Sequence, residues 1–248
     1  MSKSVTLGGQ TLHGLDRFGS WRVLGMEGWG SSPAEKTTSE PRPLADGDYD
    51  AEVFYGPRLV TLNGRLAAKS AEYAFDAREK LSALLRTPAR MQVEQFGMTR
   101  WAEARRGRIV PGELKGRHLP FQMELRFIDP FKYGKVHAVG GSDTSPASLF
   151  QRGTVPAWPV VTVTGSAAGY TLTLNGRSVT VTRYINANNH THEIDFRTGI
   201  LRINGAVVAG GFGAVNFAQI NPGLAQNMSV TPVSGSAAIS VAYHDTYI

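Results

Sequence analysis

The stretch LPFQMELRFIDPF, residues 119–131, decides the fold class because its side chains alternate between apolar and polar. Phe121 and every second residue up to Phe127 are apolar, and the residues between them are polar or charged. An apolar residue at every second position is typical of a β-strand with one buried face. Asp129 precedes Pro130 and is therefore biased towards an extended backbone, which ends the strand. The stretch thus predicts a strand that closes a β-domain.

Upstream of this strand, residues 70–85 form the one segment with a clear helical pattern. Ser70 is a suitable N-cap, and Glu72 in the first turn is favoured by the helix dipole. Pro88 stops the helix shortly after its last turn. Helical spacing places the apolar residues on one face; they are Tyr73, Ala77, Leu81, Leu84 and Leu85.

The rest of the N-terminal half consists of short β-prone pieces, interrupted by a polar, proline-rich loop at residues 31–47. Asn63 and Gly64 lie between two alternating segments and predict a hairpin turn. We therefore expect residues 1–135 to form a β-domain with one flanking α-helix.

Downstream of residue 135 the composition changes twice. Residues 136–153 are rich in glycine and serine and are expected to form a linker. Residues 154–248 then carry seven or eight short strand patterns, and Asn-Gly pairs at 175–176 and 204–205 predict hairpins. Because no helical pattern interrupts these strands, this half is expected to be a β-sandwich or jelly roll.

Composition narrows the function classes. A chain of 248 residues is long enough for two domains with separate cores. It has no cysteine, which excludes disulfides, thiolate metal sites and a cysteine nucleophile. The N-terminus leads into no apolar segment of a secretory signal, and no apolar run is long enough to span a bilayer. The net charge of +6 favours an anionic partner but does not distinguish nucleic acid from an acidic protein surface.

His190, His192 and Glu193 lie within four residues, a grouping that could hold a metal ion. In a strand the two histidines point to one face, so both could contact the same ion. A metal site would need a third ligand, and the spacing of the other histidines supplies none. Because Ile194 and Phe196 share the same face, we expect that face to be core, and we predict neither a metal nor a cofactor.

Carboxylates offer a second route to catalysis. Asp129, Glu193, Asp195 and Asp245 could be proposed as glycosidase acids, but each lies at a strand end or hairpin, where acidic residues commonly solvate turns. No nucleophile elbow, phosphate-binding loop, dinucleotide fingerprint or zinc-protease motif is present, and the glycine-rich residues 205–214 precede no helix. We therefore predict that the protein is not an enzyme. A glycoside hydrolase is the catalytic alternative.

Residues 100–118 contain a cluster of basic side chains with one tryptophan. Counterion release could let such a cluster contact nucleic-acid phosphates. The alternatives are a solvated hairpin and a surface between subunits, and we expect a protein interface rather than specific nucleic-acid binding. The candidate interface residues are Arg100, Trp101, Arg105, Arg106 and Arg108.

Five segments occur in an order that resembles the distal tail proteins (Dit) of siphophages. They are RFIDPFKYG (126–134), QRGTVPAWPVVTVTG (151–165), HEIDFRTGILRING (192–205), FAQINPGLAQNMSV (217–230) and AAISVAYHDTYI (237–248). The residues that match the motifs of that family are Asp129, Pro130, Phe131, Gly153, Pro159, Asp195, Gly199, Gly205, Pro222, Gly223 and Asn227. Arg152 and Ile220 depart from the residues frequent in the family, and residues 1–60 match it only loosely.

The residues themselves support structural roles for several of these positions. Asp195 and Gly199 are expected to bracket a tight turn, in which the carboxylate accepts backbone N–H bonds and the glycine adopts a positive φ. Pro222 and Gly223 predict a further turn, with Asn227 bonding to nearby backbone.

The resemblance implies a mainly β fold, in which an N-terminal belt domain with one helix is followed by a galectin-like β-sandwich. It implies a structural protein of the virion tail tip, made in the cytoplasm of a bacterial host. Copies would assemble head to tail into a homo-oligomer, a hexameric ring that joins the tail tube protein to the tail-tip hub or tail-associated protein. The ring would also carry receptor-binding proteins. No membrane segment is expected.

A module that binds host-surface glycans is the alternative function. Trp158, Tyr170 and Tyr184 in the second half could stack on sugar rings. Aromatic residues of such folds are, however, more often part of the core or of an interface.

Overall fold

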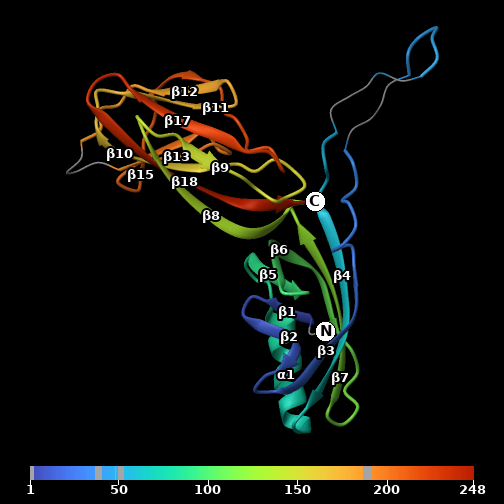
Figure 1. Ribbon diagram of the computed structural model, residues 1–248. Helices are drawn as coiled ribbons and strands as arrows, with labels where there is room; N and C mark the ends of the chain where they lie inside the picture. Colours follow the sequence, from blue (N-terminus) through green and yellow to red (C-terminus); the bar gives the residue numbers. More distant parts are fainter. Residues whose placement is uncertain (1–2, 37–40, 48, 50–52, 187–190) are drawn as a thin grey trace. The chain divides into compact units, whose positions relative to one another are not determined.

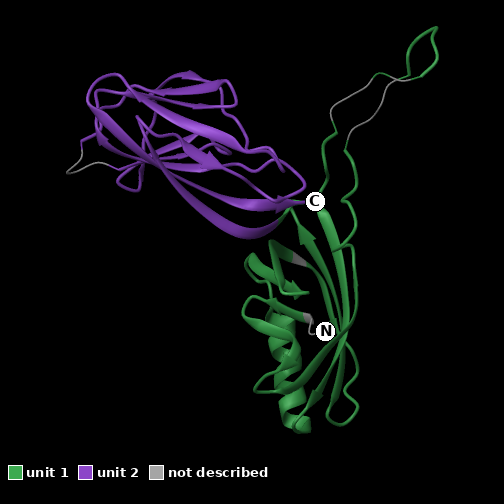
Figure 2. Cartoon of the chain, viewed as in Figure 1, with its two compact units in different colours: residues 1–132, 248 green, residues 133–247 purple. Residues whose placement is uncertain are grey.

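The computed structural model describes residues 3–36, 41–47, 49, 53–186 and 191–248. The chain divides into two compact units, the first made of residues 1–132 with Ile248 and the second of residues 133–247 (Figure 2). The described residues form antiparallel strands and one α-helix, so the predicted mainly β fold with a single helix is confirmed (Figure 1). No helix in the described part of the chain has the length and apolar character needed to cross a membrane.

In the first unit seven antiparallel strands form a closed hydrogen-bonded circuit. They are β1 (Lys3–Leu7), β2 (Gln10–Leu15), β3 (Gly19–Glu27), β4 (Arg58–Ala68), β5 (Ala89–Gln95), β6 (Met98–Pro111) and β7 (His118–Phe127). The order is β5-β1-β2-β3-β4-β7, and β6 pairs with β5 through residues 98–104 and with β7 through residues 105–111. The register of the β6–β7 pair shifts between Arg106 and Arg108. A Cβ atom on Gly107 would lie 2.5 Å from the carbonyl oxygen of Glu124, so glycine permits this close approach.

The core of the first unit follows the predicted alternation. In β7 the apolar residues from Phe121 to Phe127 are buried and the residues between them are exposed. Strand β4 pairs with β7 and buries Val60, Leu62 and Leu66 on the same side. The cluster is completed by side chains from the other strands and the helix.

The predicted hairpin turn at Asn63 and Gly64 is wrong, because both residues lie inside β4. Gly64 pairs with Val23 of β3 and with Phe121 of β7. A Cβ atom on Gly64 would lie 2.3 Å from the Phe121 ring and 2.8 Å from the carbonyl oxygen of Arg22. This glycine therefore makes room for an aromatic ring across the sheet instead of turning the chain.

Helix α1 (Ala71–Ala83) lies close to its predicted position. The Ser70 hydroxyl caps the helix by accepting the backbone N–H of Tyr73 at 3.3 Å. The buried residues are Ala74, Ala77 and Leu81, whereas Tyr73 is 42% exposed. The predicted face was thus correct for Ala77 and Leu81 and wrong for Tyr73.

The second unit is a sandwich of two antiparallel sheets. One sheet has the order β15-β14-β13-β10-β18-β8 and the other has the order β16-β12-β11-β17-β9. Apolar residues of both sheets form one buried cluster. The strands are β8 (Lys132–Ser142), β9 (Ala147–Leu149), β10 (Val160–Ser166), β11 (Tyr170–Leu174), β12 (Arg177–Val181), β13 (His192–Asp195), β14 (Ile200–Ile203), β15 (Ala206–Val207), β16 (Phe212–Val215), β17 (Gln226–Pro232) and β18 (Ser236–Tyr247).

Residues 136–153 are not a plain linker, because they contain most of β8 and all of β9. Strand β8 pairs with β18 and β9 pairs with β17, so both belong to the sandwich. Glycine and serine are tolerated here because most β8 side chains are only partly buried or exposed. Gly141 is needed for a close approach, since a Cβ atom there would lie 2.5 Å from the backbone nitrogen of Ala147.

Candidate functional site

His192 lies in β13 and is completely buried. A hydrogen bond of 2.9 Å joins its Nδ1 atom to the hydroxyl of Tyr170, and Ile194 and Phe196 are buried with it. The predicted core face is therefore confirmed for His192. His190 lies outside the described residues, so its position stays a prediction. Within the described ranges, no group of three or more histidine, cysteine, aspartate or glutamate side chains could hold a metal ion.

The acidic residues weighed as catalytic groups have structural contacts. Asp245 is 4% exposed; its Oδ1 atom accepts the backbone N–H of Arg152 at 2.8 Å and lies 3.0 Å from Nε2 of His137. Glu193 accepts a bond of 3.1 Å from Arg202. Asp129 and Asp195 accept backbone N–H bonds in turns.

The turn between β13 and β14 has the predicted construction. Oδ1 of Asp195 accepts the backbone N–H groups of Arg197 and Thr198, at 2.8 and 3.3 Å. Gly199 adopts φ +67° and donates its N–H to the Asp195 carbonyl oxygen at 2.9 Å. Gly205, with φ +81°, is the second residue of the next hairpin turn. Asp195, Gly199 and Gly205 thus organise the two turns between residues 195 and 206.

Asp129, Pro130 and Phe131 form a turn at the end of the first unit. Oδ1 of Asp129 accepts the backbone N–H of Phe131 at 3.2 Å. The Pro130 carbonyl oxygen accepts a bond of 2.9 Å from Nε of Arg58, a side chain that is 1% exposed. Arg58 also donates to the carbonyl oxygens of Gly28, Trp29 and Ser31. The motif therefore helps to hold a buried guanidinium.

A second buried cation lies beside Arg58. Nζ of Lys132 donates to the carbonyl oxygen of Trp29 at 3.0 Å, and the residue is 8% exposed. Burial, together with the positive charges of Arg58 and Arg100, lowers the pKa of Lys132 to about 8. Burial also lowers the pKa of Arg58. No pattern in the sequence indicated that these two cations would be internal.

Gly153 and Pro159 have roles in backbone packing. A Cβ atom on Gly153 would lie 2.0 Å from the carbonyl oxygen of Thr246, so only glycine fits against β18. The carbonyl oxygen of the buried Pro159 accepts the backbone N–H of Phe196 at 3.1 Å.

Pro222 and Gly223 form a turn, as predicted, but the side chain that organises it is Gln226. Its Oε1 atom accepts the backbone N–H of Asn221 at 3.1 Å, and its Nε2 atom donates to the carbonyl oxygens of Asn221 and Leu224. Asn227 is exposed and points to the other side of β17. The hydrogen bonds to nearby backbone that were predicted for Asn227 are thus made by the side chain of Gln226.

The basic segment begins in β6. The Trp101 ring is partly buried, and the guanidinium carbon of Arg90 lies 3.8 Å from its centroid. Nη2 of Arg100 lies 3.9 Å from the sulfur of Met98. Trp101 therefore packs under a cation within its own chain.

Farther along β6 two arginines are exposed to solvent. Arg105 and Arg108 are exposed, and Arg105 lies opposite Arg126 of β7 in the register. Arg106 has its backbone in β6, but its side chain lies outside the described ones. Because like charges directly opposite each other on neighbouring strands repel, the Arg105–Arg126 pair lowers the stability of the sheet within a single chain.

The three aromatic residues considered for sugar stacking differ in exposure. Tyr170 is fully buried, and burial raises the pKa of its hydroxyl, so the prediction that it could stack on a sugar is wrong. Trp158 is partly buried against the core. Tyr184 is 57% exposed.

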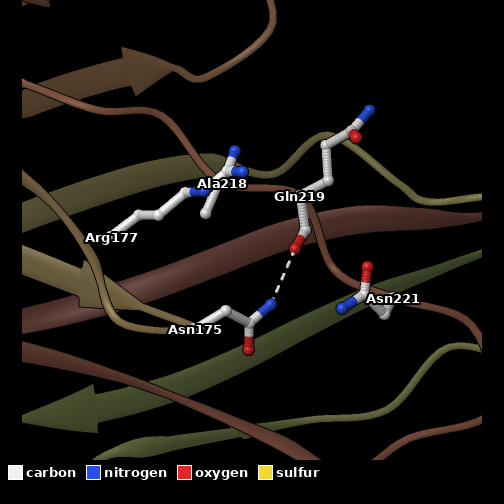
Figure 3. A pocket seen from close by; sticks show the side chains of 5 residues that line it. All are labelled: Asn175, Arg177, Ala218, Gln219 and Asn221. Atoms are coloured by element: carbon white, nitrogen blue, oxygen red, sulfur yellow. Dashed lines mark hydrogen bonds between the residues drawn. The ribbon is translucent and has the colours of Figure 1, made fainter. Parts of the chain in front are cut away.

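A polar hollow of about 290 Å³ lies between the β11–β12 turn and the segment before β17 (Figure 3). Nδ2 of Asn175 donates to the carbonyl oxygen of Gln219 at 3.0 Å and to Oε1 of the buried Gln226. These bonds fix two of its walls. The lining residues are Asn175, Arg177, Ala218, Gln219 and Asn221. The sequence marked only the Asn175 turn, next to Arg177, because Ala218, Gln219 and Asn221 come from a distant segment.

The whole chain is similar in fold to solved phage structures. It matches the crystal structure of the SPP1 Dit protein, described as a paradigm of the hub adsorption apparatus in phages that infect Gram-positive bacteria. This match covers 100% of both chains, with a TM-score of 0.75 and 14% identity. The chain therefore has the Dit fold. No protein-family model and no curated protein matches it.

Two structures of the phage p2 baseplate in its activated conformation are also similar. For the form with calcium the TM-score is 0.52 with 6% identity, and for the form with strontium it is 0.53 with 7% identity. Each match covers 98% of both chains.

Proposed function

We propose that this protein is a structural component of a phage tail, located at the hub or baseplate of the virion tail tip. The observation that carries this proposal is the fold match to the SPP1 Dit protein over the full length of both chains. The carboxylates of Asp129, Glu193, Asp195 and Asp245 are engaged in hydrogen bonds within the fold, as expected for structural rather than catalytic residues.

The finer proposal is a head-to-tail homo-oligomer, a hexameric ring of a long non-contractile tail. The ring joins the tail tube protein to the tail-tip hub, provides a passage for DNA and carries receptor-binding proteins. Ring contacts lie in the N-terminal domain of residues 1–135, and the galectin-like C-terminal sandwich contacts neighbouring tail proteins. A cyclic ring needs two different patches on each subunit. The exposed Arg105 and Arg108 of β6 are candidates for one of them.

Mass photometry over a concentration series tests the ring. We expect a species of about six times the chain mass of 26.8 kDa, in exchange with single chains. A protein that stays monomeric at the highest concentrations, or stops at a closed dimer, contradicts self-assembly into a ring.

The second candidate function is binding of host-surface glycans, and the polar hollow of the sandwich favours it. One guanidinium and three side-chain amides line the hollow, and such groups bond to sugar hydroxyls and carboxylates. A glycan array tests this with Arg177→Ala and, as the matched control, Arg183→Ala, an exposed arginine outside the hollow. Sugar binding lost only with Arg177→Ala supports the candidate. Absence of binding by the unmodified protein contradicts it.

A further inference from the structure

Two cations are buried in the first unit, at the start of β4 and at the start of β8. Arg58 and Lys132 are 1% and 8% exposed, and neither forms an ion pair with a carboxylate of the described residues. Burial, with the charges of Arg58 and Arg100, lowers the pKa of Lys132 to about 8, so its ammonium is still largely protonated near pH 7. A buried charge without a partner is unfavourable. An anion beside this pair would therefore stabilise the fold.

The hydrogen bonds of the two cations leave donors unused. Nε and Nη1 of Arg58 donate to backbone carbonyl oxygens, whereas Nη2 is buried and has no hydrogen-bond partner within the described part of the chain. Nζ of Lys132 can donate three hydrogen bonds and donates to the carbonyl oxygen of Trp29 at 3.0 Å. That oxygen also accepts from Nη1 of Arg58 at 3.3 Å, so the guanidinium and the ammonium are neighbours. The pair thus combines two positive charges with N–H donors that lack an acceptor.

Aromatic and backbone groups surround the two cations but do not neutralise them. The Trp29 ring lies 5.9 Å from Nζ of Lys132 and packs edge-to-face against Phe127, with 5.9 Å between the ring centroids. A ring face attracts a cation, but it brings no net negative charge. The carbonyl groups around Arg58 are dipoles, which lessen the cost of burying the guanidinium without cancelling its charge. A counter-ion must therefore come from outside these residues.

The burial of the two cations limits what can bind there. Because Nη2 of Arg58 is inaccessible to solvent and Lys132 is 8% exposed, a phosphate group or a side chain of another protein has too little surface to contact both. A water molecule could accept a bond from Nη2, but it would leave both charges uncompensated. A monatomic anion is small, accepts several N–H bonds and carries the missing charge. A halide therefore fits the site best, and chloride is the common one.

We propose that the first unit binds a chloride ion beside Nη2 of Arg58 and Nζ of Lys132. The ion accepts charge-assisted hydrogen bonds from both nitrogens and supplies their counter-charge. It thereby strengthens the junction of three segments that are distant in the sequence: residues 28–31, the start of β4 and residues 130–132. The site lies within a single chain, so it does not depend on the proposed ring.

A chloride titration near pH 7 tests the site in the intact protein. Sodium chloride replaces sodium gluconate at constant ionic strength, so only the anion changes. We expect the Tm of the unmodified protein to rise by about 2–5 °C and then to level off, as for a ligand that binds only the folded chain. Lys132→Met should lose this rise, and Lys135→Met, at an exposed lysine of the same strand, should keep it. An equal rise in Lys132→Met, or no rise in the unmodified protein, overturns the proposal.

Phosphate in place of chloride separates a halide site from a general salt effect. At the same ionic strength it should leave the Tm close to its value in gluconate, because the site is too enclosed for a polyatomic anion. A rise as large as that with chloride would contradict the proposal.

Crystals grown in bromide locate the ion without any substitution. Bromide scatters anomalously, and we expect a peak within hydrogen-bond distance of Nη2 of Arg58 and Nζ of Lys132. A water molecule at this position, or bromide only at the protein surface, would show that the two cations have no halide partner.

Discussion

At the scale of single residues, Gly64 is fixed by packing, because a Cβ atom there would lie 2.3 Å from the Phe121 ring. Asn-Gly predicted turns correctly at 175–176 and 204–205, where the glycines have positive φ and open space around them. At Asn63 and Gly64 the same pair lies within β4. There the glycine is required by a ring from a strand that is distant in sequence, and no local pattern contains that information.

We expect Gly64→Ala to lower the free energy of unfolding by about 1–3 kcal/mol, because the added methyl group overpacks the site. The Phe121 ring cannot withdraw easily, since it is 4% exposed and lies 5.7 Å from the Trp21 ring. Gly30→Ala is the control, with no atom within 4 Å of the added Cβ, and it should change the stability by less than about 0.5 kcal/mol. Urea unfolding of both variants measures the difference. Equal stabilities would show that the glycine is not needed for packing.

Lys132 should make the stability depend on pH in the alkaline range. Its pKa is about 8 in the folded chain, whereas the ordinary pKa of a lysine, expected in the unfolded chain, is 10.5. Between these values the unfolded chain binds more protons, so the free energy of unfolding should rise with pH and level off near pH 10.5. The rise is of the order of 1–3 kcal/mol.

Lys132→Met removes the titrating group and should abolish this rise, and Lys135→Met, an exposed lysine of β8, should leave it intact. Denaturant unfolding at several pH values measures it. A rise of equal size in Lys132→Met would assign it to another group.

At the scale of single elements, α1 was predicted within a few residues of its ends, because a cap and a proline define them locally. The prediction of which helix residues are buried was less accurate. Packing selects the small Ala74 and leaves Tyr73 outside, where the Lys69 ammonium lies 5.9 Å from its ring. Strand β8 was missed because its glycines and serines resemble a linker, and its pairing partner β18 lies about a hundred residues later in the sequence.

The helix offers a matched pair of substitutions. Leu81→Ala removes a fully buried side chain and should cost about 3 kcal/mol of unfolding free energy. Phe75→Ala removes a larger but exposed side chain from the same helix and should cost less than about 0.5 kcal/mol in the monomer. Thermal unfolding of the dissociated protein measures both. Similar losses in the two variants would contradict the assigned face.

At the scale of the whole molecule, each unit has its own buried cluster. A fragment of residues 133–248 should therefore fold alone and give a cooperative calorimetric transition. Its near-UV circular dichroism should show packed aromatic residues. A fragment that melts gradually, without such a signal, would show that the sandwich depends on the first unit.

The order of strand patterns and family-like motifs was enough to predict the fold class. The sequence did not reveal the polar hollow, the buried cations or the positive φ of Phe96. Each of these depends on neighbours that are distant in the chain or on a backbone angle. The one local signal of a hairpin at Phe96 was the pair Phe96-Gly97, which separates the strand-like stretches MQVEQ and MTRWAEA and has glycine at its second position.

Cryo-EM of the assembled protein tests the proposed ring most directly. We expect a closed ring around a central channel, in which neighbouring chains are related by rotation and each chain uses two different surfaces of residues 1–132. A two-fold dimer that uses the same surface on both chains, or particles that contain only single chains, would contradict it.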